Sequence, residues 1–104
     1  SFLQSDKNEL EQAESSYQEA LEIRKKLAEV NHQTYLPDVA TTLNNLGVLQ
    51  RAKNELEQAE SSYQEALEIY QKLAEVNPQT YLPNVATTLN NLGVLQKAKN
   101  ELEQ

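Results

Sequence analysis

The chain holds few side chains that could carry out catalysis. His32 is the only histidine, no cysteine is present, and the residue that corresponds to His32 in a second copy of the sequence is Pro78. A metal centre needs several such ligands, and a nucleophile needs a base beside it. We therefore expect neither a metal site nor a catalytic histidine.

Other polar groups also lack catalytic spacing. Glu55, Glu57 and Glu60 resemble a carboxylate cluster, but their spacing is that of a solvated helical face. Ser61 and Ser62 have no base on the same face, and the two glycines are isolated, so no phosphate-cradling loop exists. We expect no enzyme activity and no cofactor.

Composition excludes further classes. The net charge is −7, which disfavours nucleic acid, whose binding depends on clustered Lys and Arg. No apolar run approaches the roughly 20 residues of a membrane span. The first residues, Ser-Phe-Leu-Gln-Ser-Asp-Lys, lack the basic and apolar regions of a signal peptide. The absence of cysteine leaves the compartment open, and we favour the cytoplasm.

The chain repeats itself after 46 residues. Residues 8–53 and 54–99 differ only at the pairs Arg24/Tyr70, Lys25/Gln71, His32/Pro78, Asp38/Asn84 and Arg51/Lys97. A period between 20 and 50 residues indicates a repeat solenoid, in which each unit packs only on its neighbours.

Apolar residues recur at helical spacing through 9–30, 55–76 and the segments between them. Asn8 is expected to cap the helix 9–30, and Asn54 to make a tight turn. We expect the second helix to begin near Thr34, as its N-cap, although the bias of residues before proline allows a start near Pro37. It should end near Ala52 and recur over 82–98, with Pro78 and Pro83 in the loop before it. Gly47 predicts the close approach of another backbone.

Both helical patterns carry a signature. Leu43, Leu46, Gly47, Ala59, Tyr63 and Ala66 resemble the tetratricopeptide repeat in identity and spacing, and the pattern returns at Leu89, Leu92 and Gly93 and, upstream, at Ala13, Tyr17 and Ala20. The resemblance implies an all-α, right-handed superhelical α-solenoid of antiparallel helix-turn-helix units, each with a helix A and a helix B.

The string Asn31-His32 followed by Pro37–Leu46 is similar to kinesin light chain repeats, with Gln33–Leu36 inserted. Gln71 stands where shorter repeats carry proline, which implies a longer helix B. The single fragment 1–104 then divides into repeat elements. They are the end of a truncated helix A (1–7), helix B (8–30), a complete A–B repeat (34–76), helix A (80–99) and the start of a truncated helix B (100–104).

The resemblance implies that helices A line a concave groove for a peptide or protein partner. The groove positions would be Thr41, Asn44, Asn45, Val48, Arg51, Thr87, Asn90, Asn91, Val94 and Lys97. Asparagine amides offer both a donor and an acceptor to a peptide backbone, and Arg51 and Lys97 favour acidic ligands. Alternatively, the Asn pairs satisfy polar groups between helices.

The leading functional hypothesis is therefore a protein–protein interaction scaffold. The alternative is a structural, self-assembling array without a specific ligand. The ends of the chain present apolar stripes that would pair with the complementary stripe of another copy. Such contact is either an open end-to-end stack or a closed dimer that exchanges helices.

Overall fold

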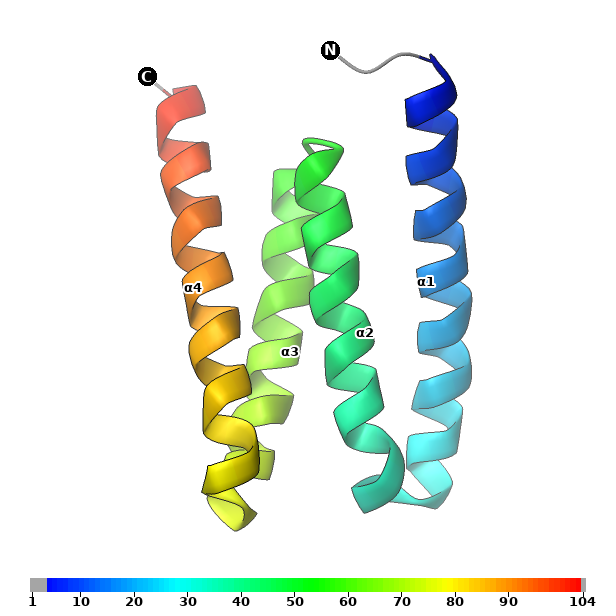
Figure 1. Cartoon of the computed structure of the whole chain (residues 1–104), viewed down its shortest axis with the longest axis vertical. Coiled ribbons are helices and arrows are strands. Elements are labelled where there is room, and N and C mark those ends of the chain that lie inside the picture. The colour runs from blue at the N-terminus through cyan, green and yellow to red at the C-terminus, as the bar shows by residue number, and fades with distance from the viewer. Residues whose placement is uncertain (1–3, 104) are drawn as a thin grey trace.

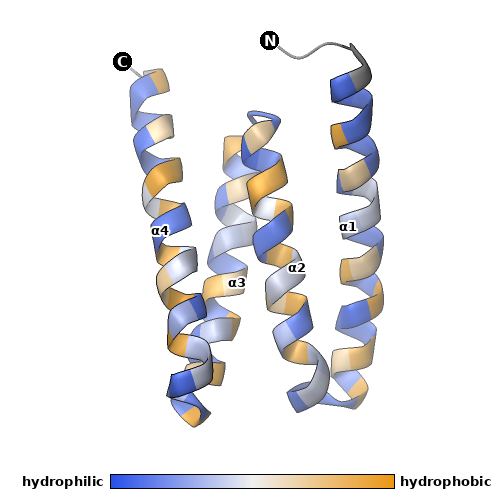
Figure 2. Cartoon of the chain, viewed as in Figure 1, coloured by the Kyte–Doolittle hydropathy of each residue, from blue (hydrophilic) through white to orange (hydrophobic). Residues whose placement is uncertain are grey.

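A computed structural model of the chain describes residues 4–103, which form four helices and, within that range, no strand. The helices are α1 (Gln4–Val30), α2 (His32–Ala52), α3 (Leu56–Val76) and α4 (Pro78–Glu103). Polar and apolar residues are interspersed along each helix (Figure 2), as amphipathic packing requires. The predicted all-α helical repeat fold is confirmed, whereas the handedness of the superhelix stays a prediction.

The helices form a thin slab with α1 and α4 at its two edges (Figure 1). Each helix packs on the next one in the chain, and α2 also meets α4. The slab measures 42 × 29 × 17 Å, and its shortest span suits two layers of helices, whose axes pack about 8–10 Å apart. In the view of Figure 1, α3 forms the rear layer and passes behind both α2 and α4.

Two apolar clusters hold the slab together. The first joins α1, α2 and α3, and the second joins α3 and α4 through Tyr63 and Leu95. A Cβ atom added to Gly47 would lie 2.6 Å from the Tyr63 ring. Glycine is therefore required at this position because an aromatic ring, rather than the predicted backbone, presses on α2.

Helices α2 and α4 begin earlier than the sequence predicted. The side chain of Asn31, not Thr34, caps α2 by accepting a hydrogen bond from the Thr34 amide at 3.3 Å. Asn77 accepts from the Thr80 amide at the same distance, so α4 begins at Pro78. An Asn that accepts such a bond satisfies one of the unpaired amides of the first turn, and this replaces the predicted loops with single-residue joins.

Pro37 and Pro83 consequently lie inside helices rather than beside a loop. Each follows the N-cap by six residues, so the backbone carbonyl that its missing N–H would have bonded belongs to the exposed first turn, at Gln33 or Gln79. Water can hydrate that carbonyl, which explains why both prolines are tolerated there.

The turn between α2 and α3 was predicted correctly. Asn54 adopts a left-handed conformation with φ of 65°, and α2 ends at Ala52. The Glu55 amide donates to the Gln50 carbonyl at 2.8 Å, and the Asn54 amide donates to the Arg51 carbonyl at 2.9 Å. This pair of bonds is a Schellman motif, in which Asn is a frequent left-handed residue.

One six-residue segment occurs three times in the chain, but it forms a turn only in its middle copy. Lys-Asn-Glu-Leu-Glu-Gln occurs at 7–12, 53–58 and 99–104, yet α1 passes through the first copy and α4 continues into the third. The predicted breaks at Asn8 and at 99–100 are therefore wrong, as is the predicted end of the fourth helix near 98. At 53–58 the turn brings α3 against α2, whereas the described parts of the outer copies continue the helical hydrogen bonding of α1 and α4.

No helix among the residues described is both long enough and apolar enough to span a bilayer.

Candidate functional site

The predicted groove residues lie on α2 and α4, on both sides of the place where these helices meet. There the Asn91 amide nitrogen donates a hydrogen bond to the Asn44 side-chain oxygen at 3.3 Å. Both asparagines are half-buried. We call the surface around this bond the α2–α4 face; it comprises Thr41, Asn44, Asn45, Val48, Arg51, Thr87, Asn90, Asn91, Val94 and Lys97.

The two asparagines of each pair have different surroundings. Asn44 and Asn91 contact each other, which is the inter-helix role that the sequence left open as an alternative. Asn45 and Asn90 are exposed. Because Asn45 corresponds to Asn91 and Asn90 to Asn44, the bond joins non-equivalent positions of successive copies.

The remaining residues of the face are solvent-exposed. Val48 and Val94 are 48% and 41% exposed, and Arg51 and Lys97 add one positive charge to each helix. Burial raises the pKa of Tyr63, and the positive charge of Arg51 opposes that rise.

Both threonines of the face already make hydrogen bonds. The Thr41 hydroxyl lies 2.9 Å from the Tyr70 hydroxyl, and the Thr87 hydroxyl donates to the Pro83 carbonyl at 3.0 Å. These bonds reduce what the threonines can offer to a partner. Asparagine, valine and the two cations therefore dominate the chemistry of the face.

A repeated ion pair was missed by the sequence reasoning. Lys53 at the end of α2 pairs with Glu14 of α1 and, at 3.2 Å, with Glu55. The equivalent Lys99 of α4 pairs with Glu60 and Glu57 of α3, at 2.8 and 3.0 Å. These two glutamates and Glu55 therefore bind lysines rather than forming only a solvated face.

The ion pairs shift the pKa values of their own members. The hydrogen bond from Lys53 holds the pKa of Glu14 below its ordinary value, and that from Lys99 does the same for Glu60. The same bonds raise the pKa of both lysines. The 46-residue period preserves all four residues, but 39 positions separate each Lys from its Glu, so only the fold reveals the pairing.

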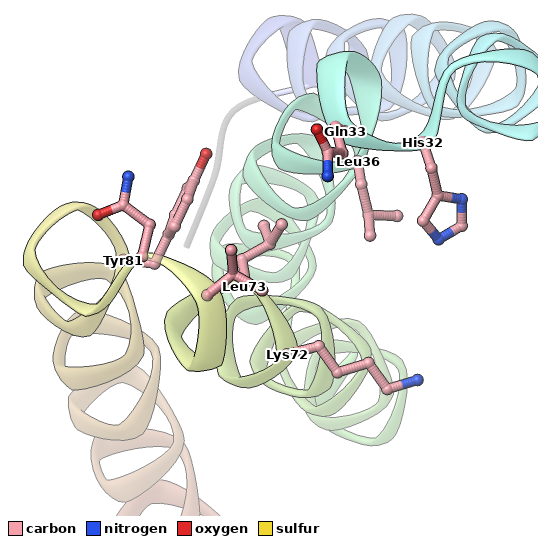
Figure 3. A pocket seen from close by; sticks show the side chains of 8 residues that line it. His32, Gln33, Leu36, Lys72, Leu73 and Tyr81 are labelled. Atoms are coloured by element: carbon pink, nitrogen blue, oxygen red, sulfur yellow. The ribbon is translucent and has the colours of Figure 1, made fainter.

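A cleft of about 370 Å³ opens where α2 begins, α3 ends and α4 begins (Figure 3). Leu36 and Leu73 lie at its centre, between His32 and Lys72 on one side and Tyr81 on the other. Two segments singled out in the sequence line it. They are the apparent insertion Gln33–Leu36 and the part of α3 that continues beyond Gln71. The sequence indicated longer helices but not this space between their ends.

His32 is the first residue of α2 and lies beside the end of α1. Its Nδ1 lies 3.3 Å from the Ala28 carbonyl at the end of α1. Among the residues whose side chains the structure describes, 6–102, no group of three or more His, Cys, Asp or Glu is placed to hold a metal ion.

Comparison with known proteins identifies a family. The chain matches the Tetratricopeptide repeat model over residues 2–72, which is more than half of its length. No curated protein matches it. Tetratricopeptide repeats are generally non-catalytic modules for protein–protein interaction. The antiparallel helices, the six signature positions and this match agree, and the chain belongs to the tetratricopeptide repeat family.

Proposed function

We propose that this chain binds a peptide or protein partner on the α2–α4 face. The observation that carries the proposal is the group of unengaged polar and apolar side chains around the Asn44–Asn91 bond. The bond fixes the relative position of α2 and α4 there. A partner therefore meets a face that is already arranged, which lowers the entropy cost of binding.

The proposed ligand is an extended segment with acidic character or a free terminal carboxylate. Asn45 and Asn90 offer amide donors and acceptors to its backbone. Arg51 and Lys97 attract carboxylates, while Val48 and Val94 contribute apolar contact. The cations stand out because the chain as a whole has a net charge of −7.

The face would extend over repeat units. We propose that α2 and α3, over 34–76, are helices A and B of one complete repeat, with α1 (8–30) as a preceding helix B and α4 (80–99) as a following helix A. Successive helices A then line the concave side of the solenoid. The kinesin light chain-like character of these units is part of the same proposal.

A peptide array tests the function. It would display acidic, neutral and basic extended sequences, each with a free or an amidated C-terminus. The double variant Asn45→Ala/Asn90→Ala should lose most binding, because it removes exposed amides and leaves the Asn44–Asn91 bond intact. Arg51→Gln/Lys97→Gln should weaken the binding of acidic peptides more than that of neutral or basic ones. The binding that remains should be less sensitive to salt.

The matched control is Gln64→Ala, which removes an exposed amide from α3. Its binding should equal that of the wild type. Saturable peptide binding that survives both double variants, or that is lost equally in the control, would contradict the proposal for this face. No saturable binding by any peptide class would contradict the function itself.

A further inference from the structure

Helices α2 and α4 have nearly the same sequence but different neighbours. Over 32–52 and 78–98 they differ only at His32/Pro78, Asp38/Asn84 and Arg51/Lys97. In α2, one side packs on α1 and another side packs on α3. In α4, the side that corresponds to the contact with α1 packs on α3, and the side that corresponds to the contact with α3 is uncovered among the residues described.

Exposure identifies the uncovered side. Leu43 is 2% exposed in α2, whereas the equivalent Leu89 is 50% exposed. Ala40 is fully buried, but Ala86 is exposed. The clearest contrast is at the glycines: the Tyr63 ring presses on Gly47, and nothing would lie within 4 Å of a Cβ at Gly93. The surface of α4 at Gly93 therefore has room for a tyrosine ring.

Helix α1 carries the complementary surface. Its Ser16, Tyr17 and Ala20 correspond to Ser62, Tyr63 and Ala66, which α3 buries against α2. Tyr17 and Ala20 are only half-buried, and Ile23 and Leu27 are 54% and 40% exposed. Therefore α1 has the side chains of α3 at these positions, but among the described residues no helix packs on them as α2 packs on α3.

We propose that α4 of one copy of this chain binds α1 of a second copy, with Tyr17 of the second copy placed on Gly93. The contact between α2 and α3 inside each chain supplies the geometry. There Tyr63 lies on Gly47, and the Ser62 hydroxyl donates to the Gln50 side-chain oxygen at 2.7 Å. Across the new interface, Ser16 would donate to Gln96 in the same way.

The interface departs from this template at the position of Tyr70. Tyr70 bonds Thr41 inside the chain, but the α1 residue at that position is Arg24. Arg24 already donates to the Thr42 hydroxyl of its own chain. It can keep that bond while its aliphatic stem covers apolar surface, so it does not bar the contact.

The contact is heterologous, because α1 and α4 lie at opposite edges of the slab (Figure 1). Each bound copy leaves one free α1 and one free α4. The assembly therefore grows end to end and does not close as a two-fold dimer. This contact does not involve the ligand chemistry proposed for the α2–α4 face.

Sedimentation velocity over a concentration series tests the proposal on the full chain. The wild type should form species larger than a dimer as its concentration rises. In Gly93→Ala the new Cβ would meet the incoming Tyr17 ring as a Cβ at Gly47 would meet Tyr63. Such overpacking should weaken association by about ten- to a hundred-fold. Val76→Ala, an apolar truncation at a position of α3 that is 84% exposed, is the control and should associate like the wild type.

Mixing two blocked variants distinguishes the mode of contact. Gly93→Ala retains an intact α1, and Tyr17→Ala retains an intact α4, so each alone should stay monomeric at concentrations where the wild type associates. Their mixture should form 1:1 dimers that grow no further. Circular dichroism of each variant confirms that it remains helical.

A wild type that stays monomeric up to several hundred micromolar would overturn the proposal. So would association that Gly93→Ala leaves unchanged, or blocked variants that remain monomeric when mixed. Wild-type association that stops at a dimer would also overturn it and would indicate a closed, helix-exchanged dimer instead. Peptide binding by a monomeric chain would leave the function proposed above in place.

Discussion

The middle and the edge of this molecule present one helix sequence in two settings. Helix α2 lies between α1 and α3, and its Val39, Ala40 and Leu43 are at most 2% exposed. In α4 the equivalent Leu89 is half exposed, and Leu95 and Thr88, which face α3, are fully buried. Burial at a given position of the repeat is thus decided by the neighbouring helix and not by the residue type.

The comparison separates two sources of stability in a solenoid. One is the contact of each helix with the helix before it, which α2 and α4 share. The other is the contact with the helix after it, which, of α2 and α4, only α2 has among the described residues. Paired substitutions at equivalent positions measure these contributions separately, since the local sequence is held constant.

The largest difference is expected for leucine truncation. Leu43→Ala leaves a cavity in the first apolar cluster and should lower the free energy of unfolding by about 2–5 kcal/mol. Leu89→Ala removes a half-exposed side chain and should cost less than about 1 kcal/mol. Urea unfolding at low micromolar concentration measures both values. Equal losses would show that α4 is covered as α2 is.

Smaller changes in the free energy of unfolding, of opposite sign, are expected when two equivalent threonines are replaced by valine. Thr42 accepts a hydrogen bond from Arg24 and donates one to the Asp38 carbonyl at 2.8 Å. The equivalent Thr88 hydroxyl is buried and has no partner within residues 4–103, because Tyr70 replaces Arg24 and bonds Thr41 instead. Thr42→Val should destabilise by about 1–2 kcal/mol, and Thr88→Val should stabilise by about 1 kcal/mol.

Thermal unfolding at one fixed pH and low concentration resolves these changes. The two substitutions are identical in shape, so each serves as the control for the other. Destabilisation by Thr88→Val would show that its hydroxyl has a partner after all.

The smallest effect concerns the ion pair of Glu14 with Lys53. The pKa of Glu14 is held below 4.5, so its contribution to stability is complete above about pH 4.5 and is lost as pH falls through the lowered pKa. The pKa of Lys53 is raised above 10.5, so its contribution is complete below that pH and is lost at higher pH. Glu14→Gln should cost no more than about 1 kcal/mol at pH 7, since Lys53 keeps Glu55.

Unfolding measured from pH 7 to about pH 3 tests this prediction. The stability of Glu14→Gln should fall less with acidification than that of the wild type. Glu29→Gln, which removes the same charge from an exposed position, should follow the wild-type slope. Parallel curves for all three proteins would contradict a special role for Glu14.

Sequence alone predicted most of the fold because its signals are local and periodic. Apolar spacing located the four helices of residues 4–103, and Asn54 marked the turn of that range that has left-handed backbone. The identical segments at 7–12 and 99–104 were misread, because a turn there depends on a packed partner helix rather than on Asn itself. The caps at Asn31 and Asn77 were missed since Thr34 was an equally acceptable cap.

The candidate site was predictable only as a set of positions. The register placed Asn45 and Asn90 on one face with Val48 and Val94, and the structure exposes all four. It could not show that Asn44 and Asn91 are engaged with each other, because their distance depends on how closely α2 and α4 approach. The ion pairs of Lys53 and Lys99 and the cleft beside Leu36 depend on the same three-dimensional arrangement.

The most direct test of the account compares Gly47→Ala with Gly93→Ala in urea unfolding at a concentration where the chain is monomeric. Alanine favours a helix over glycine by about 1 kcal/mol, so Gly93→Ala, with open space around it, should stabilise by about that amount. At Gly47 the new Cβ lies 2.6 Å from the buried Tyr63 ring, and overpacking of about 1–3 kcal/mol should outweigh the gain. The account predicts shifts of opposite sign. Shifts of the same sign and size would contradict it, because α2 and α4 would then have equivalent surroundings.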